Sequence, residues 1–439
     1  MHPSAETLNK NIQSVNPNIY DMLSSYGKES YFPALGILSQ GAEAATKAKK
    51  YNATIGIATE NGAAMHLKCI KDMVPGLSPA EIFNYAPPGG VLALRDGWAA
   101  KMRQENPTLG SFPVSKPIVT NALTHGLALI GDLFVNSGDT VVLPTHFWEN
   151  YELLYVTKYG ANFSFYDLYN DKRKFNVDGF KKTLINALKA KGKVVTVLNF
   201  PNNPTGYSIY KDEAPLIAAA IKEAAQYGKI VAVADDAYYS LFFDDNMLTE
   251  SIFGYLAGIH ENVLAVKVDG ATKEEFVWGL RVGFLTYGVK SDGNPAALYT
   301  ALEQKTMGCL RASISNVSNL SQNLVLKALS HPEFNSQKNQ KLETMKARAN
   351  ETRRVLDSRP EFKEFWDYYP FNAGYFMCLK LHSLNANDLR LKVLDNYGVG
   401  TIALGATDLR VAFSCLNVDQ IADVFDLIYK AAKDLQNSK

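Results

Sequence analysis

The 439-residue sequence has few cysteines, almost no net charge and no long apolar run. Its four cysteines, Cys69, Cys309, Cys378 and Cys415, show no paired spacing for a metal and fit a reducing compartment. A formal net charge of +1 predicts no general affinity for nucleic acid or for an acidic membrane. No stretch approaches the roughly 20 apolar residues of a membrane span, and the first residues lack a secretory signal. We therefore expect a cytoplasmic protein without a bound metal.

What the sequence does contain is a large apolar fraction and an alternating order of elements. Apolar residues make up 47% of the chain and aromatic residues 11%, which is enough for a large core without disulfides. From about residue 62 to 288, helical patterns alternate with short strands such as 140–143, 194–198 and 230–234. This alternation predicts an α/β fold with a mainly parallel sheet between two layers of helices. Beyond residue 296, long helices and two further strands predict a smaller α/β unit.

Lys273 and Arg281 lie in the connection between two strand-like runs, 263–266 and 282–285. A lysine brought close to buried strands is costly to keep as an ammonium ion, and proteins use such lysines as deprotonated nucleophiles. Arg281 is a permanent cation suited to a phosphate. An amine for an aldehyde and a cation for a phosphate are what a pyridoxal phosphate site requires. This segment alone leaves open the alternative of a solvated surface pair.

Two further polar segments follow predicted parallel strands. Asn203 lies in an Asn-Pro-Thr-Gly turn after one strand, and Asp235 ends the next strand, ahead of Tyr238. Open α/β sheets bind ligands at the carboxyl ends of their strands. A carboxylate there can pair with a protonated pyridine nitrogen, while Asn203 and Tyr238 can donate to a ring oxygen. The alternatives are a plain turn at Asn203 and a helix cap made by Asp235 or Asp236.

Taken in order, these motifs resemble those of the class I pyridoxal phosphate-dependent aminotransferases (fold type I), closest in pattern to the aspartate and aromatic amino acid aminotransferases. The pieces are Asn-Pro-Thr-Gly, Asp-x-Ala-Tyr, a lysine with an arginine eight residues later, and Arg-Val-Ala-Phe-Ser at 410–414. The resemblance runs from about Tyr51 to the C-terminus. It implies a large, mainly parallel, seven-stranded-type sheet sandwiched by helices. It also implies pyridoxal 5'-phosphate as cofactor, and transamination between aspartate or an aromatic amino acid and a 2-oxo acid, with 2-oxoglutarate expected.

The resemblance further assigns roles around the cofactor ring. Lys273 would form the Schiff base and carry the proton between the substrate Cα and the cofactor. Asp235 would hold the pyridinium, while Asn203 and Tyr238 would bond the ring oxygen. Trp148 matches the aromatic residue that stacks on the pyridine face. Trp148 could equally be ordinary core, with the neighbouring Phe147 as the competing candidate for the stack.

The phosphate would be bound by Arg281 and by the start of a helix. The segment 120–130 reads as a turn entering an apolar helix, so backbone amides around Thr124 and His125 would lie at its positive end. A simple N-cap is the alternative. The family usually has serine three residues before the lysine, whereas this chain has Gly270; Thr272 would compensate for the missing hydroxyl.

Substrate and partner contacts are also implied by the resemblance. Arg410 would bind the substrate α-carboxylate as a bidentate fork, beside Asn203. Tyr85 resembles the tyrosine that the family lends to the neighbouring subunit's phosphate, which implies a homodimer with shared active sites. Arg311, in Arg-Ala-Ser-Ile-Ser-Asn, resembles the arginine that reads a side-chain carboxylate across the interface; a structural arginine is the alternative.

We expect three segments along the chain. Residues 1–57 would be an N-terminal segment packing with the small domain, 58–305 the large cofactor-binding domain and 306–439 the small domain. Two other functions remain open on the same fold. One is a lyase that catalyses β-elimination or decarboxylation. The other is a regulatory protein that binds the cofactor without turnover, although no basic helix-turn-helix segment precedes Tyr51.

Overall fold

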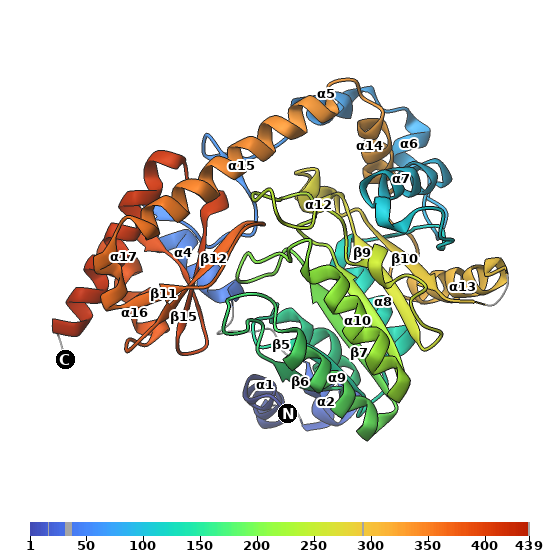
Figure 1. The fold of residues 1–439 in the computed structure, drawn as a ribbon, viewed down its shortest axis with the longest axis horizontal. Coiled ribbons are helices and arrows are strands. Elements are labelled where there is room, and N and C mark those ends of the chain that lie inside the picture. Colours follow the sequence, from blue (N-terminus) through green and yellow to red (C-terminus); the bar gives the residue numbers. More distant parts are fainter. Residues whose placement is uncertain (16, 31–36, 292–293, 438–439) are drawn as a thin grey trace.

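Two sheets of unequal size organise the structure, a computed structural model that describes residues 1–15, 17–30, 37–291 and 294–437. The larger sheet has seven strands and the smaller has four. Figure 1 shows the two units side by side, with the long helix α15 (Phe334–Asp357) running from the larger unit towards the smaller one. Within this described part of the chain, no helix has the length and apolar character needed to cross a bilayer.

The seven-stranded sheet is mainly parallel, as the sequence predicts. Its spatial order is β4-β10-β9-β8-β7-β5-β6, and only β10 runs antiparallel to its neighbours. The strands are β4 (Ile118–Thr120), β5 (Thr140–Pro144), β6 (Asn162–Tyr166), β7 (Lys193–Asn199), β8 (Lys229–Asp235), β9 (Val263–Asp269) and β10 (Gly283–Val289).

Alternating side chains of these strands supply two cores, one on each face of the sheet. In β7, Val195 packs into the core that includes helix α8 (Ala122–Phe134), whereas Val194 packs into the core formed with α9 (Val177–Lys191) and α10 (Glu213–Ala224). Successive residues of a strand point to opposite faces, so a strand covered on both sides must be apolar throughout. The continuous valine-rich runs of the sequence have this cause.

The smaller unit is an antiparallel sheet covered by helices. Its strands are β11 (Trp366–Tyr368), β12 (Phe376–Leu381), β14 (Ile402–Leu404) and β15 (Asp408–Ala412), and its helices include α16 (Ala386–Tyr397) and α17 (Ile421–Asn437). Helix α4 (Ile37–Lys47) contacts α16, and β1 (Tyr51–Asn52) pairs in parallel with β13 (Val399–Gly400). Residues 37–52 therefore pack against the C-terminal unit.

The remaining elements are short or lie outside the two sheets. They are α1 (Pro3–Val15), α2 (Pro17–Met22), α3 (Ser25–Glu29), β2 (Thr59–Glu60), β3 (Ala63–Ala64), α5 (Lys68–Met73), α6 (Pro79–Phe83), α7 (Leu92–Glu105), α11 (Phe253–Leu256), α12 (Ala271–Glu274), α13 (Ala296–Ser313) and α14 (Asn319–Leu329). Of these, α12 follows β9 at the carboxyl edge of the large sheet, where it carries Lys273.

Candidate active site

A cavity of about 1250 Å³ lies at the carboxyl edge of the large sheet. Its walls come from the segments that follow β4, β5, β7, β8 and β9, and the smaller unit adds further side chains, among them Asp408 and Arg410 on β15. Nine of the residues predicted from the sequence line it: Thr124, Trp148, Asn203, Asp235, Tyr238, Thr272, Lys273, Arg281 and Arg410. Parallel strands end at one edge, which is why side chains so distant in sequence converge.

Lys273 is a half-buried lysine on the single turn α12. Its Nζ lies 4.6 Å from the centre of the Tyr238 ring. Burial lowers the pKa of Lys273 to about 8; Asp235 opposes this shift and Arg281 adds to it. A larger share of this amine is therefore deprotonated near neutral pH than for an ordinary lysine, which is the state that attacks a carbonyl.

Asp235, at the end of β8, is a buried carboxylate held by two donors. The Tyr151 hydroxyl donates to Oδ2 at 2.5 Å, and the Ala237 amide donates to Oδ1 at 3.1 Å. Burial raises the pKa of Asp235 to about 6, although the Tyr151 hydrogen bond and the charge of Lys273 lower it. The sequence did not reveal this role of Tyr151, because only the tertiary fold brings residues 84 positions apart together.

Arg410 crosses from the smaller unit to the cavity wall. The guanidinium donates to Asn203 Oδ1 at 3.1 Å and to the Thr54 carbonyl at 3.3 Å, and it lies 4.2 Å from the centre of the Phe376 ring. Its Nε is buried and has no hydrogen-bond partner in the described part of the chain. Burial lowers the pKa of Arg410. A buried guanidinium with an unused N–H beside a cavity suits a carboxylate ligand.

The start of α8 forms another wall of the cavity. Ala122, its first residue, has a left-handed φ of 61°, and the N-cap Asn121 makes no side-chain capping bond. The first amides of a helix lack intrahelical partners and favour an anion. Thr124 lines the cavity. His125 does not; it accepts from the Asn121 amide through Nδ1 at 3.1 Å and contacts Ser313 Oγ at 3.2 Å.

The presence of glycine at position 270, where the family usually has serine, has a steric explanation. A Cβ atom built there would lie 2.6 Å from both the Gly283 Cα and the Val282 carbonyl oxygen. Because backbone atoms cannot yield to such contacts, the family's usual serine does not fit this backbone. Thr272 lies two residues on, lines the cavity, and has a buried hydroxyl without a hydrogen-bond partner in the described residues.

Trp148 and Phe147 both line the cavity. The Trp148 ring meets Tyr151 edge-on, with 5.5 Å between ring centres and 81° between planes. Phe147 packs against Phe163 and Phe165 on β6, with 5.6 and 5.4 Å between ring centres. Which of the two would stack on a bound ring stays a prediction.

Tyr85 and Arg311 do not line the cavity of their own chain. Tyr85 is 90% exposed and follows α6. Arg311, near the end of α13, is also exposed and donates to Ser315 Oγ. The structure of one chain therefore does not bring these two residues to the predicted site.

The chain also matches a known protein family, and this match supports the interpretation of the cavity. Residues 56–428 match the model of the family described as aminotransferase class I and II. The chain belongs to this family. Members of the family use pyridoxal 5'-phosphate, as the sequence motifs predict.

Similar solved structures show the same fold. An aminotransferase from Anaerococcus prevotii superposes with a TM-score of 0.81 at 21% identity, covering 94% of this chain and 99% of the other. A multiple substrate aminotransferase from Thermococcus profundus gives a TM-score of 0.78 at 16% identity, covering 96% of this chain and all of the other. The predicted fold type I architecture is confirmed.

Curated relatives match over a shorter stretch. An aspartate aminotransferase from Bacillus sp. (strain YM-2) is 26% identical over 203 residues, which are 46% of this chain and 48% of that protein. A probable aspartate/prephenate aminotransferase from Thermus aquaticus is 27% identical over 201 residues, with the same coverage. The chain thus spans about half the length of the curated relatives it matches.

The residues present fit the cofactor of this family. Lys273 offers an amine with a lowered pKa and Asp235 offers a carboxylate to a ring nitrogen. The unpartnered Thr272 hydroxyl, Arg281 and the start of α8 offer donors to a phosphate. No group of three or more His, Cys, Asp or Glu side chains that could hold a metal occurs among the described residues.

Proposed function

We propose that this protein transfers the amino group of an L-amino acid to a 2-oxo acid, with pyridoxal 5'-phosphate bound in the cavity at the carboxyl edge of the large sheet. The observation that carries this proposal is the convergence of three groups in one cavity: the amine of Lys273, the buried carboxylate of Asp235 and the guanidinium of Arg410. Membership of the aminotransferase family supports it.

Each of these groups has a part in the reaction. When bound, the cofactor supplies an aldehyde that takes up the amino group and a ring that delocalises the electron pair left at Cα. Lys273 would hold the aldehyde, and its free amine would move the proton at the substrate Cα. Asp235 would keep the ring nitrogen protonated. Arg410, already fixed by Asn203, binds the substrate carboxylate and orients the Cα–H bond.

The proposed donors are aspartate and aromatic amino acids, with 2-oxoglutarate as acceptor. The names of the curated relatives, aspartate and aspartate/prephenate aminotransferases, support an acidic substrate. Arg311 of a second copy would read the side-chain carboxylate. Trp148 and Tyr151 at the cavity would tolerate an aromatic ring.

We also infer a homodimer with shared active sites. The exposed Tyr85 would reach the neighbour's phosphate, and the exposed Arg311 the neighbour's substrate. In this arrangement residues 58–305 form the cofactor-binding domain, 306–439 the small domain, and 1–57 the segment that packs with the small domain.

A panel of L-amino acids assayed with 2-oxoglutarate tests the proposal. Formation of glutamate and the matching 2-oxo acid supports transamination, whereas release of pyruvate and ammonia would assign a lyase. Borohydride reduction of the protein saturated with cofactor, followed by peptide mapping, should place the label on Lys273. A protein that binds the cofactor at Lys273 but turns over no amino acid would be a regulator.

A further inference from the structure

Helix α12, which carries Lys273, is too short to hold itself in place. It spans the four residues Ala271–Glu274, its N-cap Gly270 makes no side-chain bond, and Phe276, two residues beyond its end, has a left-handed φ of 55°. A single helical turn is unstable in water, because the entropy lost when its backbone is ordered outweighs the free energy gained from its few hydrogen bonds. Contacts from other elements must therefore fix the position of the Lys273 amine.

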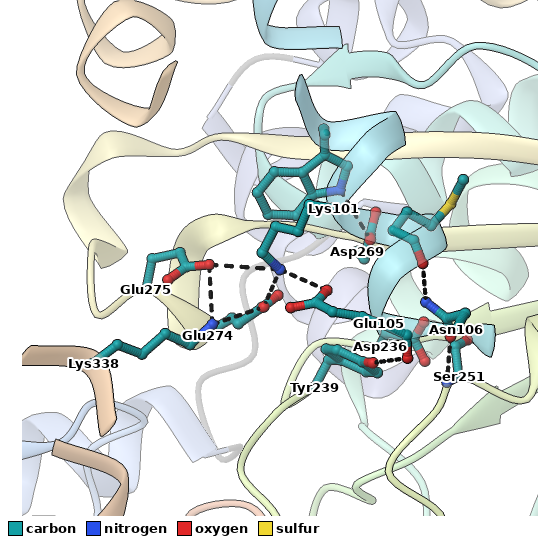
Figure 2. A network of polar contacts seen from close by, with 12 residues as sticks. Lys101, Glu105, Asn106, Asp236, Tyr239, Ser251, Asp269, Glu274, Glu275 and Lys338 are labelled. Atoms are coloured by element: carbon teal, nitrogen blue, oxygen red, sulfur yellow. Dashed lines mark hydrogen bonds and ion pairs between the residues drawn. The ribbon is translucent and has the colours of Figure 1, made fainter. Parts of the chain in front are cut away.

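Figure 2 shows the main contact set, a charge cluster that consists of Lys101, Glu105, Glu274, Glu275 and Lys338. Lys338 Nζ lies 3.0 Å from Glu274 Oε1 and 3.2 Å from Glu275 Oε1. Lys101 contacts Glu274 and also lies 2.7 Å from Glu105 and 3.7 Å from Glu275. The two glutamates that follow Lys273 are thus held between α7 and α15.

Burial makes these ion pairs depend on one another. The side chains of Glu274 and Glu275 are each 2% exposed, and that of Lys338 is 9% exposed. Removing one partner of a buried ion pair leaves an uncompensated charge. Replacing both partners by apolar groups of similar size often leaves the stability unchanged. None of the five residues lines the cavity, so the cluster does not touch substrate or cofactor.

Helix α15, which carries Lys338, also contacts the chain on the substrate side of the cavity. Further along α15, Arg348 donates to the Ser414 carbonyl at 2.5 Å, four residues after Arg410 in the chain. The segment from Lys338 to Arg348 is helical throughout, and its ten residue steps give a rise of about 15 Å. One helix therefore connects the turn that bears Lys273 with the short turn Phe413–Cys415, which directly follows the strand of Arg410.

We propose that Lys338 is a positioning residue: through Glu274 and Glu275 it fixes Lys273 on α12 relative to the substrate that Arg410 holds, with α15 as the strut between them. This inference rests on the proposed function of Lys273. Proton transfer requires the amine within hydrogen-bonding reach of Cα, and small misplacements of a reacting group are costly to the rate.

The test compares three holoenzyme variants. Lys338→Met leaves one lysine against three carboxylates in the cluster, and we expect a lower unfolding midpoint together with a kcat reduced at least about tenfold. Lys338→Met combined with Glu275→Met removes one charge of each sign, which keeps the net charge of the cluster. We expect this double variant to regain most of the unfolding midpoint but not the kcat, with KM for the amino acid unchanged. Lys346→Met is the matched control, because Lys346 lies on the same helix in a weak pair of 3.9 Å with the exposed Asp245.

A double variant that regains both the unfolding midpoint and kcat overturns the proposal, since the contacts of Lys338 with Glu274 and Glu275 would then serve stability only. If neither Lys338 variant folds, Glu275→Met alone removes one of the two Lys338 contacts and no cation. A kcat within about twofold of wild type would then overturn the proposal. The label from borohydride reduction separates the two claims: its absence from Lys273 in wild type defeats the proposed function, whereas its presence in all variants with unchanged kcat defeats only the positioning role.

Discussion

Replacing Tyr151 by phenylalanine isolates the hydrogen bond that tunes Asp235. The variant keeps the ring, which is buried and packed edge-on against Trp148, and removes only the hydroxyl that donates to Asp235 at 2.5 Å. Because that bond stabilises the charged carboxylate, its loss should raise the pKa of Asp235. Asp235 must be ionised to hold a protonated pyridine nitrogen, so cofactor binding should weaken as pH falls through the higher pKa.

The size of the effect follows from the pKa of Asp235, which burial raises to about 6. A hydrogen bond to a charged group contributes about 1.5–3 kcal/mol, which would raise this pKa to between about 7 and 8. At pH 7 the ionised fraction would fall from about 90% to between about 10% and 50%, so cofactor affinity should drop about 2- to 10-fold. At pH 9 both proteins would be almost fully ionised, and their affinities should agree within about 10%.

The assay is a titration of the apoprotein with pyridoxal phosphate at several pH values, followed by absorbance. Tyr155→Phe is the control, because Tyr155 is equally buried but donates to the Leu127 carbonyl and not to Asp235. A Tyr151→Phe affinity that is lowered by the same factor at pH 7 and pH 9 would refute the reasoning, since a packing defect has no reason to disappear at high pH.

Three other substitutions test the remaining assignments. Lys273→Ala should remove the absorbance band of the covalently bound cofactor and the borohydride label; a retained band means that another lysine is used. Arg410→Met should lower kcat/KM for every amino acid by about 30- to 4000-fold, the equivalent of about 2–5 kcal/mol for a lost buried charge pair, and unchanged kinetics would remove its assigned role. Arg311→Leu should penalise aspartate and spare phenylalanine in the same assay, whereas equal losses would make Arg311 structural.

The fold was predictable because its elements are long and their patterns are strong. The apolar runs at 194–198 and 230–234 lie within β7 and β8, which are buried on both faces and can be nothing but apolar. The antiparallel direction of β10 was not predictable, because the strand pattern at 282–285 is the same in either direction and only the length of the connection from β9 limits the choice.

The site residues that lie just after a strand could be predicted from the sequence. The contacts between residues far apart in the sequence could not. Asn203 and Lys273 each lie four residues past the end of a strand, so the sequence places them at the carboxyl edge. The bond from Tyr151 to Asp235 and the pairing of Lys338 with Glu274 join positions far apart in sequence, and no local pattern encodes them. The sequence shows that Gly270 lacks the hydroxyl of the family's serine, but the reason for the glycine lies in the backbone of Val282 and Gly283, at the start of β10.

The choice between Asp235 and Asp236 shows how a local rule and the tertiary fold together decide a role. Successive side chains at a strand end point in opposite directions, so only one of the two can face the cavity. Asp235 lines it, while Asp236 is buried on the other side against Lys267, which also lies 2.9 Å from Asp269. Burial lowers the pKa of Lys267, but the two carboxylates more than offset this and leave it raised. Lys267 therefore stays cationic and pairs with Asp236, which leaves Asp235 as the one of the two carboxylates that faces the cavity.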